Sequence, residues 1–188
     1  MKEVVIIAGP NGSGKSTLAF QLGLSVNFIN ADMCEKKLFS HIEDKETRER
    51  YVAVAVAQEI KRYLGCGESF AFETVFSSDK IPQFLRKAKS IGYTITTHFV
   101  ATENSAINVA RVAKRVSEGG HDVPKQRIID RYAKSLAVLP ELLDFSDKAI
   151  LYDNSHETMR AFLAKENGQI KVIGNVPHWA EKLISASN

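Results

Sequence analysis

Residues 9–16 combine side-chain types and a spacing that could hold a polyphosphate. They read Gly-Pro-Asn-Gly-Ser-Gly-Lys-Ser, which is the pattern Gly-x-x-x-x-Gly-Lys-Ser. Glycine adopts positive φ without penalty, so such a loop can direct its amide hydrogens toward one anion. Lys15 is expected to reach the β- and γ-phosphates, and the Ser16 hydroxyl is expected to ligate Mg²⁺. The pattern predicts that a nucleoside triphosphate, ATP or GTP, is bound by Gly9, Pro10, Asn11, Gly12, Ser13, Gly14, Lys15, Ser16 and Thr17.

The segments on either side of this loop strengthen the prediction. Residues 4–8 form an apolar run typical of a buried strand, and a helical pattern begins near Lys15. The positive end of that helix would face the phosphates. The alternative is a glycine-rich turn without a ligand. At ordinary glycine usage the full pattern arises by chance in a chain of this size on the order of once in a hundred or less.

Similar strand-like and helical segments alternate along the rest of the chain. Strands are predicted at residues 3–8, 26–30, 69–74, 94–101 and 148–154, with a short edge strand at 170–173. Helices are predicted at residues 15–24, 45–64, 79–90, 103–117, from the end of a 118–124 loop to about 143, and at 177–186. The alternation predicts an α/β fold of the P-loop NTPase type, with a parallel sheet sandwiched by helices. One domain over residues 1–188 is expected from the length.

Polar residues follow the predicted strands at the edge where a ligand of a parallel sheet would lie. Asn30 and Asp32 follow the second strand, Glu73 and Thr74 end the third, and Asp153 ends the fifth. Asp32 is the candidate general base, because a hydroxyl that accepts a phosphoryl group must lose its proton. An N-terminal helix cap is the alternative role of Asp32. Glu73 is a candidate for binding the hydroxyls of an acceptor or for holding Mg²⁺ through water, or alternatively it is a charged strand end that faces solvent.

Residues 111–134, named here the lid segment, concentrate basic side chains around a Gly-Gly loop. Seven basic and three acidic residues give the segment a net charge of +4, against +3 for the whole chain. Arg111 and Arg115 lie one helical turn apart, and Arg131 lies beyond the loop. The segment resembles the lid of small P-loop kinases, whose arginines face the transferring phosphoryl group. A solvated basic helix pair is the alternative, and it is the expectation for Lys114, Lys125 and Lys134. His121, in the loop, is expected to be a turn or cap residue rather than a ligand.

The composition excludes several classes of protein. The chain has 188 residues, of which 44% are hydrophobic and 25% charged, as in ordinary globular proteins. No apolar run approaches the length of a membrane helix, so no membrane is expected. Because the basic charge is local, no nucleic acid is expected as a partner. Cys34 and Cys66 lack the spacing of a metal or redox motif, and we expect buried free thiols of a cytoplasmic protein.

Taken together, these segments resemble the zeta toxin family of P-loop kinases. The likeness covers residue 4 to about residue 155, and its most specific part is the Gly-Gly-His segment with its flanking arginines. The matching segments are residues 9–17, Ile-Asn-Ala-Asp at 29–32, Phe-Glu-Thr at 72–74, Arg-Val-Ala-Lys-Arg-Val-Ser-Glu-Gly-Gly-His-Asp-Val-Pro at 111–124, Ile128, Arg131-Tyr132, Ser135-Leu136 and Leu-Tyr-Asp-Asn-Ser at 151–155. The family often has two arginines before the tyrosine, where this chain has Asp130-Arg131.

The resemblance implies an ATP-dependent kinase that phosphorylates a sugar-nucleotide hydroxyl, as best-known members do on UDP-N-acetylglucosamine. It implies that Lys15 and Ser16 bind phosphate and Mg²⁺ and that Asp32 is the base. Among the acceptor-binding residues it implies Glu73 and Thr74, to which Asn30 and Arg111 are added as neighbours. Arg115 and Arg131 match the best candidates for clamping the phosphates. An antitoxin protein is a possible partner. Two other interpretations stay open: a kinase of another hydroxyl metabolite or antibiotic, and a nucleotide-dependent switch or ATPase.

Overall fold

A seven-stranded mixed sheet forms the centre of the computed structural model, which describes residues 2–77 and 81–181. Within these residues the strand order is β2-β3-β1-β4-β5-β6-β7. The strands are β1 Glu3–Ala8, β2 Asn27–Ile29, β3 Phe70–Thr74, β4 Thr94–Ala101, β5 Lys148–Asp153, β6 Arg160–Glu166 and β7 Gln169–Val172. The first five strands pair in parallel, and β6 and β7 are added antiparallel at one edge.

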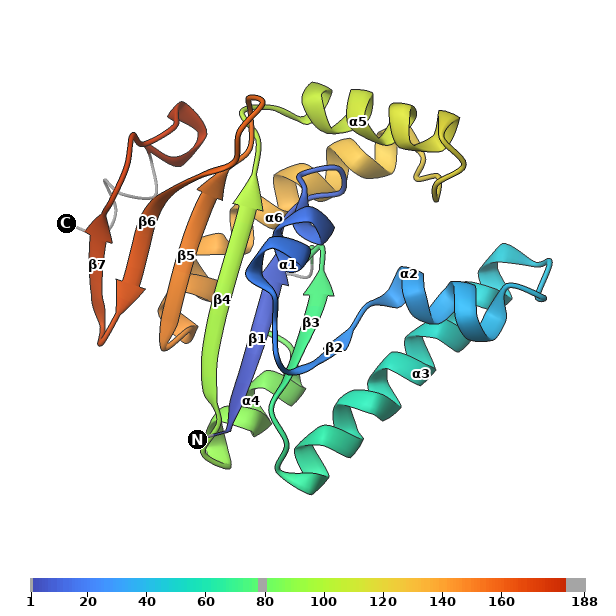
Figure 1. The fold of residues 1–188 in the computed structure, drawn as a ribbon, viewed down its shortest axis with the longest axis horizontal. Helices are drawn as coiled ribbons and strands as arrows, with labels where there is room; N and C mark the ends of the chain where they lie inside the picture. The colour runs from blue at the N-terminus through green and yellow to red at the C-terminus, as the bar shows by residue number, and fades with distance from the viewer. Residues whose placement is uncertain (1, 78–80, 182–188) are drawn as a thin grey trace.

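The chain reverses its direction of winding next to β1. The chain passes from β1 to the edge strand β2, returns to β3, and then crosses β1 to reach β4. The carboxyl ends of β1, β3, β4 and β5 therefore lie at one edge of the sheet, at the top of Figure 1. This is the switch point at which open α/β sheets bind ligands.

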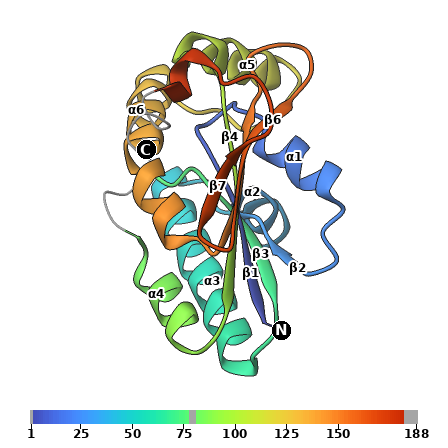
Figure 2. The same ribbon diagram turned by 90° about the vertical axis from the view of Figure 1, so that its left-hand side faces the viewer.

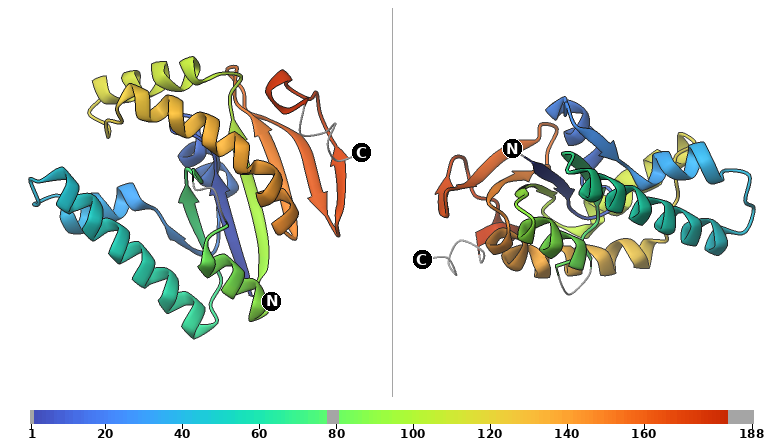
Figure 3. Two further views of the ribbon diagram at one scale, coloured as in Figure 1. Left: turned by 180° about the vertical axis from the view of Figure 1, so that it is seen from behind. Right: turned by 90° about the horizontal axis from the view of Figure 1, so that it is seen from below.

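Helices cover both faces of the sheet. They are α1 Lys15–Leu22, α2 Ala31–Cys34, α3 Lys45–Cys66, α4 Gln83–Ser90, α5 Ser105–Ser117 and α6 Lys125–Phe145, with a π-helix η1 at Glu35–Phe39 and a 3-10 helix η2 at His178–Ala180. Helix α1 lies on one face, whereas α3, α4 and α6 lie on the other (Figure 2 and the left view of Figure 3). The α2–α3 segment extends away from the sheet below α5 (Figure 1).

Alternation along β1 divides the core between these two layers. Val4, Ile6 and Ala8 belong to the large cluster on the side of α3, α4 and α6, whereas Ile7 packs with Leu18 of α1. Side chains of successive strand residues point to opposite faces, so a strand buried on both faces must be apolar throughout. The burial anchors β1 firmly, and with it the loop that follows.

The predicted α/β fold and the parallel arrangement of five strands are confirmed. The strand at β6 was not predicted, and the expectation of a wholly parallel sheet is wrong for β6 and β7, which form an antiparallel hairpin. The helix predicted at 79–90 begins at Gln83, and its positions 79 and 80 lie outside the described residues. Of the helix predicted at 177–186, η2 covers three residues, and residues 182–186 lie outside the described part.

Two further expectations concern the cysteines and the membrane. Cys66 is exposed and Cys34 half-buried, so the expected burial of both thiols is wrong, although both are free. Cys66 occupies the last turn of α3, where its side chain faces solvent. In residues 2–77 and 81–181, no helix is both long enough and apolar enough to span a bilayer.

Candidate functional site

The loop between β1 and α1 has the backbone geometry that its glycines predict. Gly9, Gly12 and Gly14 have φ values of +143°, +75° and +102°. These are conformations that residues with a Cβ atom rarely adopt. Helix α1 starts directly after Gly14, so its first amide groups lie at the mouth of the loop. Lys15 folds back over the loop, and its Nζ donates to the carbonyl of Pro10 at 2.9 Å.

Two asparagines from distant segments hold the outside of this loop. Asn108 Nδ2 on α5 donates to the carbonyl of Asn11 at 2.6 Å, and Asn154 Nδ2 after β5 donates to the carbonyl of Ser13 at 2.8 Å. Asn108 is buried and also accepts from the Thr102 hydroxyl. The two asparagines thus hold the loop through its carbonyls and occupy none of its amides, of which that of Ser13 donates to the carbonyl of Pro10 at 3.3 Å.

Glu73 joins the phosphate loop to the end of β2. Its Oε2 accepts from Ser16 Oγ at 3.0 Å and from Asn30 Nδ2 at 2.8 Å, and its Oε1 lies 3.9 Å from Lys15 Nζ. Only 14% of its side chain is exposed, so Glu73 is not a strand end that faces solvent. Hydroxyl and carboxylate oxygens in contact are the hard ligands that Mg²⁺ prefers, and the Ser16–Glu73 pair fits that ion.

Burial of Lys15 destabilises its protonated, positively charged form. Burial lowers its pKa to about 8, although Glu73 and Asp32 act in the opposite direction. Arg115 and Arg131 lower the pKa further, because they bring positive charge close to Lys15. An anion placed among these three cations would stabilise the charged lysine. The electrostatics of the site therefore favour a strongly negative ligand.

Asp32 lies in the first turn of α2, with its side chain exposed to the site. Its alternative role as a helix cap is wrong, because the cap of α2 is Asn30, whose Oδ1 accepts from Met33 N at 2.9 Å. The carboxylate is thus left available, and it influences the charge of Lys15 across the cavity. Asn30 has two functions, since its other atom, Nδ2, bonds to Glu73.

The lid segment forms the end of α5, the 118–124 loop and the first turns of α6, which approach the phosphate loop from above (Figure 1). Arg131 Nη1 donates to Asn11 Oδ1 at 3.4 Å, and Arg111 Nη2 donates to the carbonyl of His156 at 3.4 Å. Arg111 Nη1 and Arg115 Nε are hidden from solvent without a protein acceptor among the described residues. The solvated helix pair does not fit Arg111 and Arg115 placed in this way, whereas Lys114, Lys125 and Lys134 are exposed, as that alternative expects.

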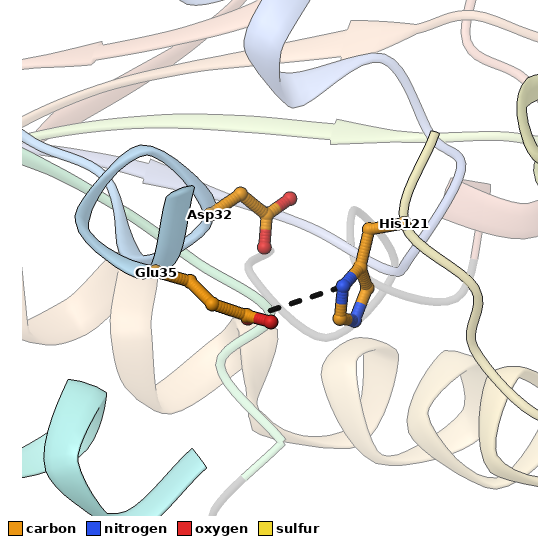
Figure 4. Close-up of side chains that lie close together, drawn as sticks. All are labelled: Asp32, Glu35 and His121. Carbon is orange, nitrogen blue, oxygen red and sulfur yellow. Dashed lines mark ion pairs between the residues drawn. The ribbon is translucent and has the colours of Figure 1, made fainter. Parts of the chain in front are cut away.

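His121 lies inside the site instead of acting as a cap. Its ring faces Asp32 and Glu35, and its Nδ1 lies 3.9 Å from Glu35 Oε2 (Figure 4). The sequence did not indicate Glu35 or Asn108, and it indicated Asn154 only as part of the 151–155 segment, without a role. Glu35 is three residues from Asp32, which is a helical spacing that could have suggested a shared face. No local signal marks Asn108, because its partner Asn11 is far away in the sequence.

Most of the site residues predicted from the sequence line one cavity of about 750 Å³. Its lining includes the selected residues Asn11, Gly12, Gly14, Lys15, Ser16, Thr17, Asn30, Asp32, Glu73, Thr74, Arg111, Arg115 and Arg131. Gly9, Pro10 and Ser13 do not line it, and Ser13 is buried beneath the loop. Val75, Phe76 and Val123 add apolar side chains to the lining. The cavity thus combines cationic, carboxylate and apolar groups.

Sequence comparison relates the segment that carries most of the residues of this site to known proteins. A sequence model of the family described as "AAA domain" matches residues 4–139, from β1 to α6. An uncharacterized protein of Haemophilus influenzae is 26% identical over 134 residues, which cover 69% of this chain and 92% of that protein.

Solved structures show the same fold. The PezAT chromosomal toxin-antitoxin system of Streptococcus pneumoniae contains a chain that aligns with a TM-score of 0.63 at 15% identity, over 85% of this chain and 72% of that one. AvrRxo1-ORF1 in complex with ORF2 and ATP aligns with a TM-score of 0.71 at 14% identity, over 98% of this chain and 63% of that chain. A putative kinase from Chloroflexus aurantiacus aligns with a TM-score of 0.53 at 22% identity, over 63% of this chain and 69% of that chain. At these identities the likeness concerns the fold alone.

Proposed function

We propose that this chain, which belongs to the AAA domain family, is an ATP-dependent kinase that transfers the γ-phosphoryl group to a hydroxyl of a small molecule. The observation that carries the proposal is the convergence of Lys15, Arg115, Arg131 and Asp32 on one cavity. Three cations suit the charge that develops on a phosphoryl group in flight, and a carboxylate suits a hydroxyl acceptor.

The part of the cavity that is lined by Lys15, Arg115 and Arg131 is assigned to the nucleotide. Backbone amides of the phosphate loop and the N-terminus of α1 would bind the β- and γ-phosphates, with Lys15 between them. Arg115 and Arg131 would neutralise the equatorial oxygens of the transferring group. Arg115 Nε has no hydrogen-bond acceptor among the described protein residues, which supports a hydrogen bond from this atom to a bound ligand. The preference for ATP over GTP is proposed from the resemblance.

Ser16 and Glu73 are the residues that would hold Mg²⁺, the first directly and the second through water. When bound, the ion would supply positive charge to the β- and γ-phosphate oxygens. The 3.0 Å bond between the Ser16 hydroxyl and Glu73 Oε2 holds both groups at the end of the loop. Glu73 also limits the conformations of Asn30, and so couples the ion site to α2.

Asp32 is assigned as the general base on the acceptor side. It is exposed in the cavity and is not occupied by the helix cap, so it can accept the proton of a hydroxyl placed opposite Lys15. Thr74, Glu73, Asn30 and Arg111 would bind the other polar groups of the acceptor. By the resemblance to zeta toxins, we propose a nucleotide sugar such as UDP-N-acetylglucosamine as this acceptor.

The test is ATP consumption by the purified protein with a panel of nucleotide sugars, free sugars and hydroxyl antibiotics, with mass spectrometry of the products. A product heavier by one phosphoryl group is expected with a nucleotide sugar, and Asp32→Asn is expected to lower its formation by about 10²- to 10⁴-fold. Phosphorylation of a different hydroxyl compound alone would replace the proposed acceptor and keep the kinase. Acceptor-independent hydrolysis that Asp32→Asn leaves unchanged would refute the transfer reaction.

A protein partner is a separate part of the proposal. Two structural relatives come from a toxin-antitoxin system and from an ORF1:ORF2 complex, and we infer an antitoxin partner for this chain by analogy. Growth arrest on expression of the wild type in a bacterial host, absent for Lys15→Ala, is expected if the kinase is toxic. Equal growth of both strains would remove the reason for an antitoxin.

A further inference from the structure

Asp32, Glu35 and His121 form a cluster of ligand atoms that the proposed phosphoryl transfer does not need as a unit. One ligand atom from each residue lies within 4.8 Å of the others (Figure 4). Asp32 and Glu35 belong to the continuous helix formed by α2 and η1, and His121 belongs to the loop between α5 and α6. The cluster therefore connects the lid segment to the opposite wall of the cavity.

The two carboxylates are held on one side by the local helix. They are three residues apart and so share a helical face. At Glu35 the helix widens from α to π geometry, a change that is frequent at functional sites. Glu35 Oε1 accepts from Arg48 Nε at 2.7 Å, which leaves Oε2 directed at His121. An outer partner of this kind fixes the orientation of a ligating carboxylate.

The histidine is placed by the turn that follows α5. Gly119 has φ of +83°, and the amide of Gly120 donates to the carbonyl of Arg115 at 2.8 Å, which ends the helix. A Cβ on Gly120 would lie 2.5 Å from Arg115 Cγ, so only glycine lets the chain turn back this closely. Arg115 Nη2 then donates to the carbonyl of His121 at 2.7 Å.

We propose that Asp32, Glu35 and His121 form a binding site for a divalent transition metal of the zinc type. One imidazole and two carboxylates are a ligand set that suits Zn²⁺ and its neighbours, whereas Mg²⁺ prefers oxygen ligands alone. Tetrahedral zinc with bonds of about 2.0–2.2 Å holds its ligand atoms about 3.3 Å apart. His121 Nδ1 and Glu35 Oε2 lie 3.9 Å apart, and the ligand atoms of all three residues lie within 4.8 Å of one another, so rotations of the side chains must bring them closer by about 1.5 Å or less.

This site is distinct from the Mg²⁺ position at Ser16 and has a different consequence. A metal on the triad would fasten the 118–124 loop to α2 across the mouth of the cavity. It would also occupy Asp32, and a ligated carboxylate does not accept a proton. If the proposed kinase activity holds, zinc is therefore expected to inhibit it, and His121→Ala is expected to reduce this inhibition. Binding of the metal itself does not depend on that activity.

The test is calorimetric titration of the chelator-treated full chain with Zn²⁺ in excess Mg²⁺ and without ATP. One zinc ion per chain is expected, with His121→Ala and Glu35→Gln each weakening binding about tenfold or more. His178→Ala is the matched control, because His178 Nδ1 lies 3.1 Å from Glu181 Oε2 in an exposed pair that does not belong to the lining of the cavity. This variant is expected to bind zinc as the wild type does.

Cys34 is the competing ligand, since a half-buried free thiol lies between Asp32 and Glu35 in the sequence. Cys34→Ser should therefore leave zinc binding in place. The proposal is wrong if the wild type binds no zinc, if His121→Ala binds it unchanged, or if Cys34→Ser alone abolishes binding. Because no nucleotide or acceptor is present, none of these results bears on the proposed kinase function, which the product analysis tests separately.

Discussion

The side chain of Asn108 donates a hydrogen bond to the backbone carbonyl of Asn11 at 2.6 Å, across 97 residues of sequence. Asn154 makes the corresponding bond to the carbonyl of Ser13 at 2.8 Å. The phosphate loop is thus held from outside by α5 and by the segment after β5. The first of these two segments also carries Arg111 and Arg115, so the helix that supplies candidate phosphate ligands also positions the loop.

The first prediction concerns this support. Asn108→Ala is expected to weaken ATP binding about tenfold, because a neutral hydrogen bond is worth about 0.5–1.5 kcal/mol and the loop loses its fixed orientation. The free energy of unfolding should fall by about 1–3 kcal/mol, since the buried Asn108 side chain also accepts from the Thr102 hydroxyl, which keeps only the Asn104 carbonyl as acceptor in the variant. ATP titration and urea unfolding, followed by the fluorescence of Trp179, measure the two effects.

Asn104→Ala is the matched control on the same helix. Asn104 is exposed and caps α5 by accepting from the amides of Ala106 and Ile107. Its loss should cost about 1 kcal/mol of stability without changing ATP affinity. Equal ATP affinities of the wild type and Asn108→Ala would show that the loop keeps its shape without this bond.

The second prediction concerns the room around Gly12. A Cβ at Gly12 would lie 2.6 Å from the carbonyl oxygen of Asn108, at a φ of +75°. Gly12→Ala must therefore displace α5 from the loop, and we expect ATP binding to be lost together with more than about 2 kcal/mol of unfolding free energy.

Gly23→Ala is the control, because its new Cβ meets nothing within 4 Å at a φ of +53°. This variant should lower the free energy of unfolding by only about 1–2 kcal/mol, for the left-handed backbone, and should keep ATP binding. Similar losses in both variants would contradict a steric role of α5.

Features that depend on neighbouring residues could be predicted from the sequence, whereas features that depend on tertiary contacts could not. The phosphate loop, β1 and the arginine spacing of α5 were predictable because each depends on neighbouring residues. Strand β6 was missed because Phe162 and Leu163 are both buried, which removes the alternation that marks a half-buried strand.

The functional role of His121 depends on tertiary structure. Its proximity to Glu35 depends on the turn at Gly119 and Gly120 and on the packing of α5 over the cavity, which no short sequence pattern encodes. Asp32 could be selected as a base from its place after β2, but its release from helix capping could not, because Asn30 and Asp32 are both good caps.

The third prediction concerns pH. Lys15 has its pKa lowered to about 8 by burial, and only the protonated amine binds phosphate strongly. ATP affinity should therefore be highest below pH 8 and fall as the pH rises through that value. Glu73 raises this pKa, so Glu73→Gln should lower it and move the loss of affinity to lower pH. Dissociation constants of ATP measured without Mg²⁺, from about pH 6 to about pH 10, give both profiles.

A matched carboxylate tests whether the effect on Lys15 is local. Glu46 lies exposed in the first turn of α3, and Glu46→Gln should keep the wild-type profile. An unchanged midpoint in Glu73→Gln would mean that Glu73 does not act on the charge of Lys15. A shift of the same size in both variants would point to the net charge of the protein instead.

The fourth prediction separates binding from transfer through two arginines of α6. Arg131 lines the cavity and contacts Asn11 Oδ1, and we expect Arg131→Ala to lower kcat by about 10³-fold or more with a smaller change in the KM for ATP. The reason is that the guanidinium faces charge that grows only in the transition state.

Arg127 is the control on the same helix, one turn earlier. Its side chain is 46% exposed, and its Nη1 lies 3.6 Å from Glu49 Oε1, so Arg127→Ala should keep kcat within about twofold. Steady-state kinetics with the identified acceptor measure both variants. A rise in KM alone for Arg131→Ala would assign this arginine to ground-state binding and leave Arg115 as the group that stabilises the transferring phosphoryl.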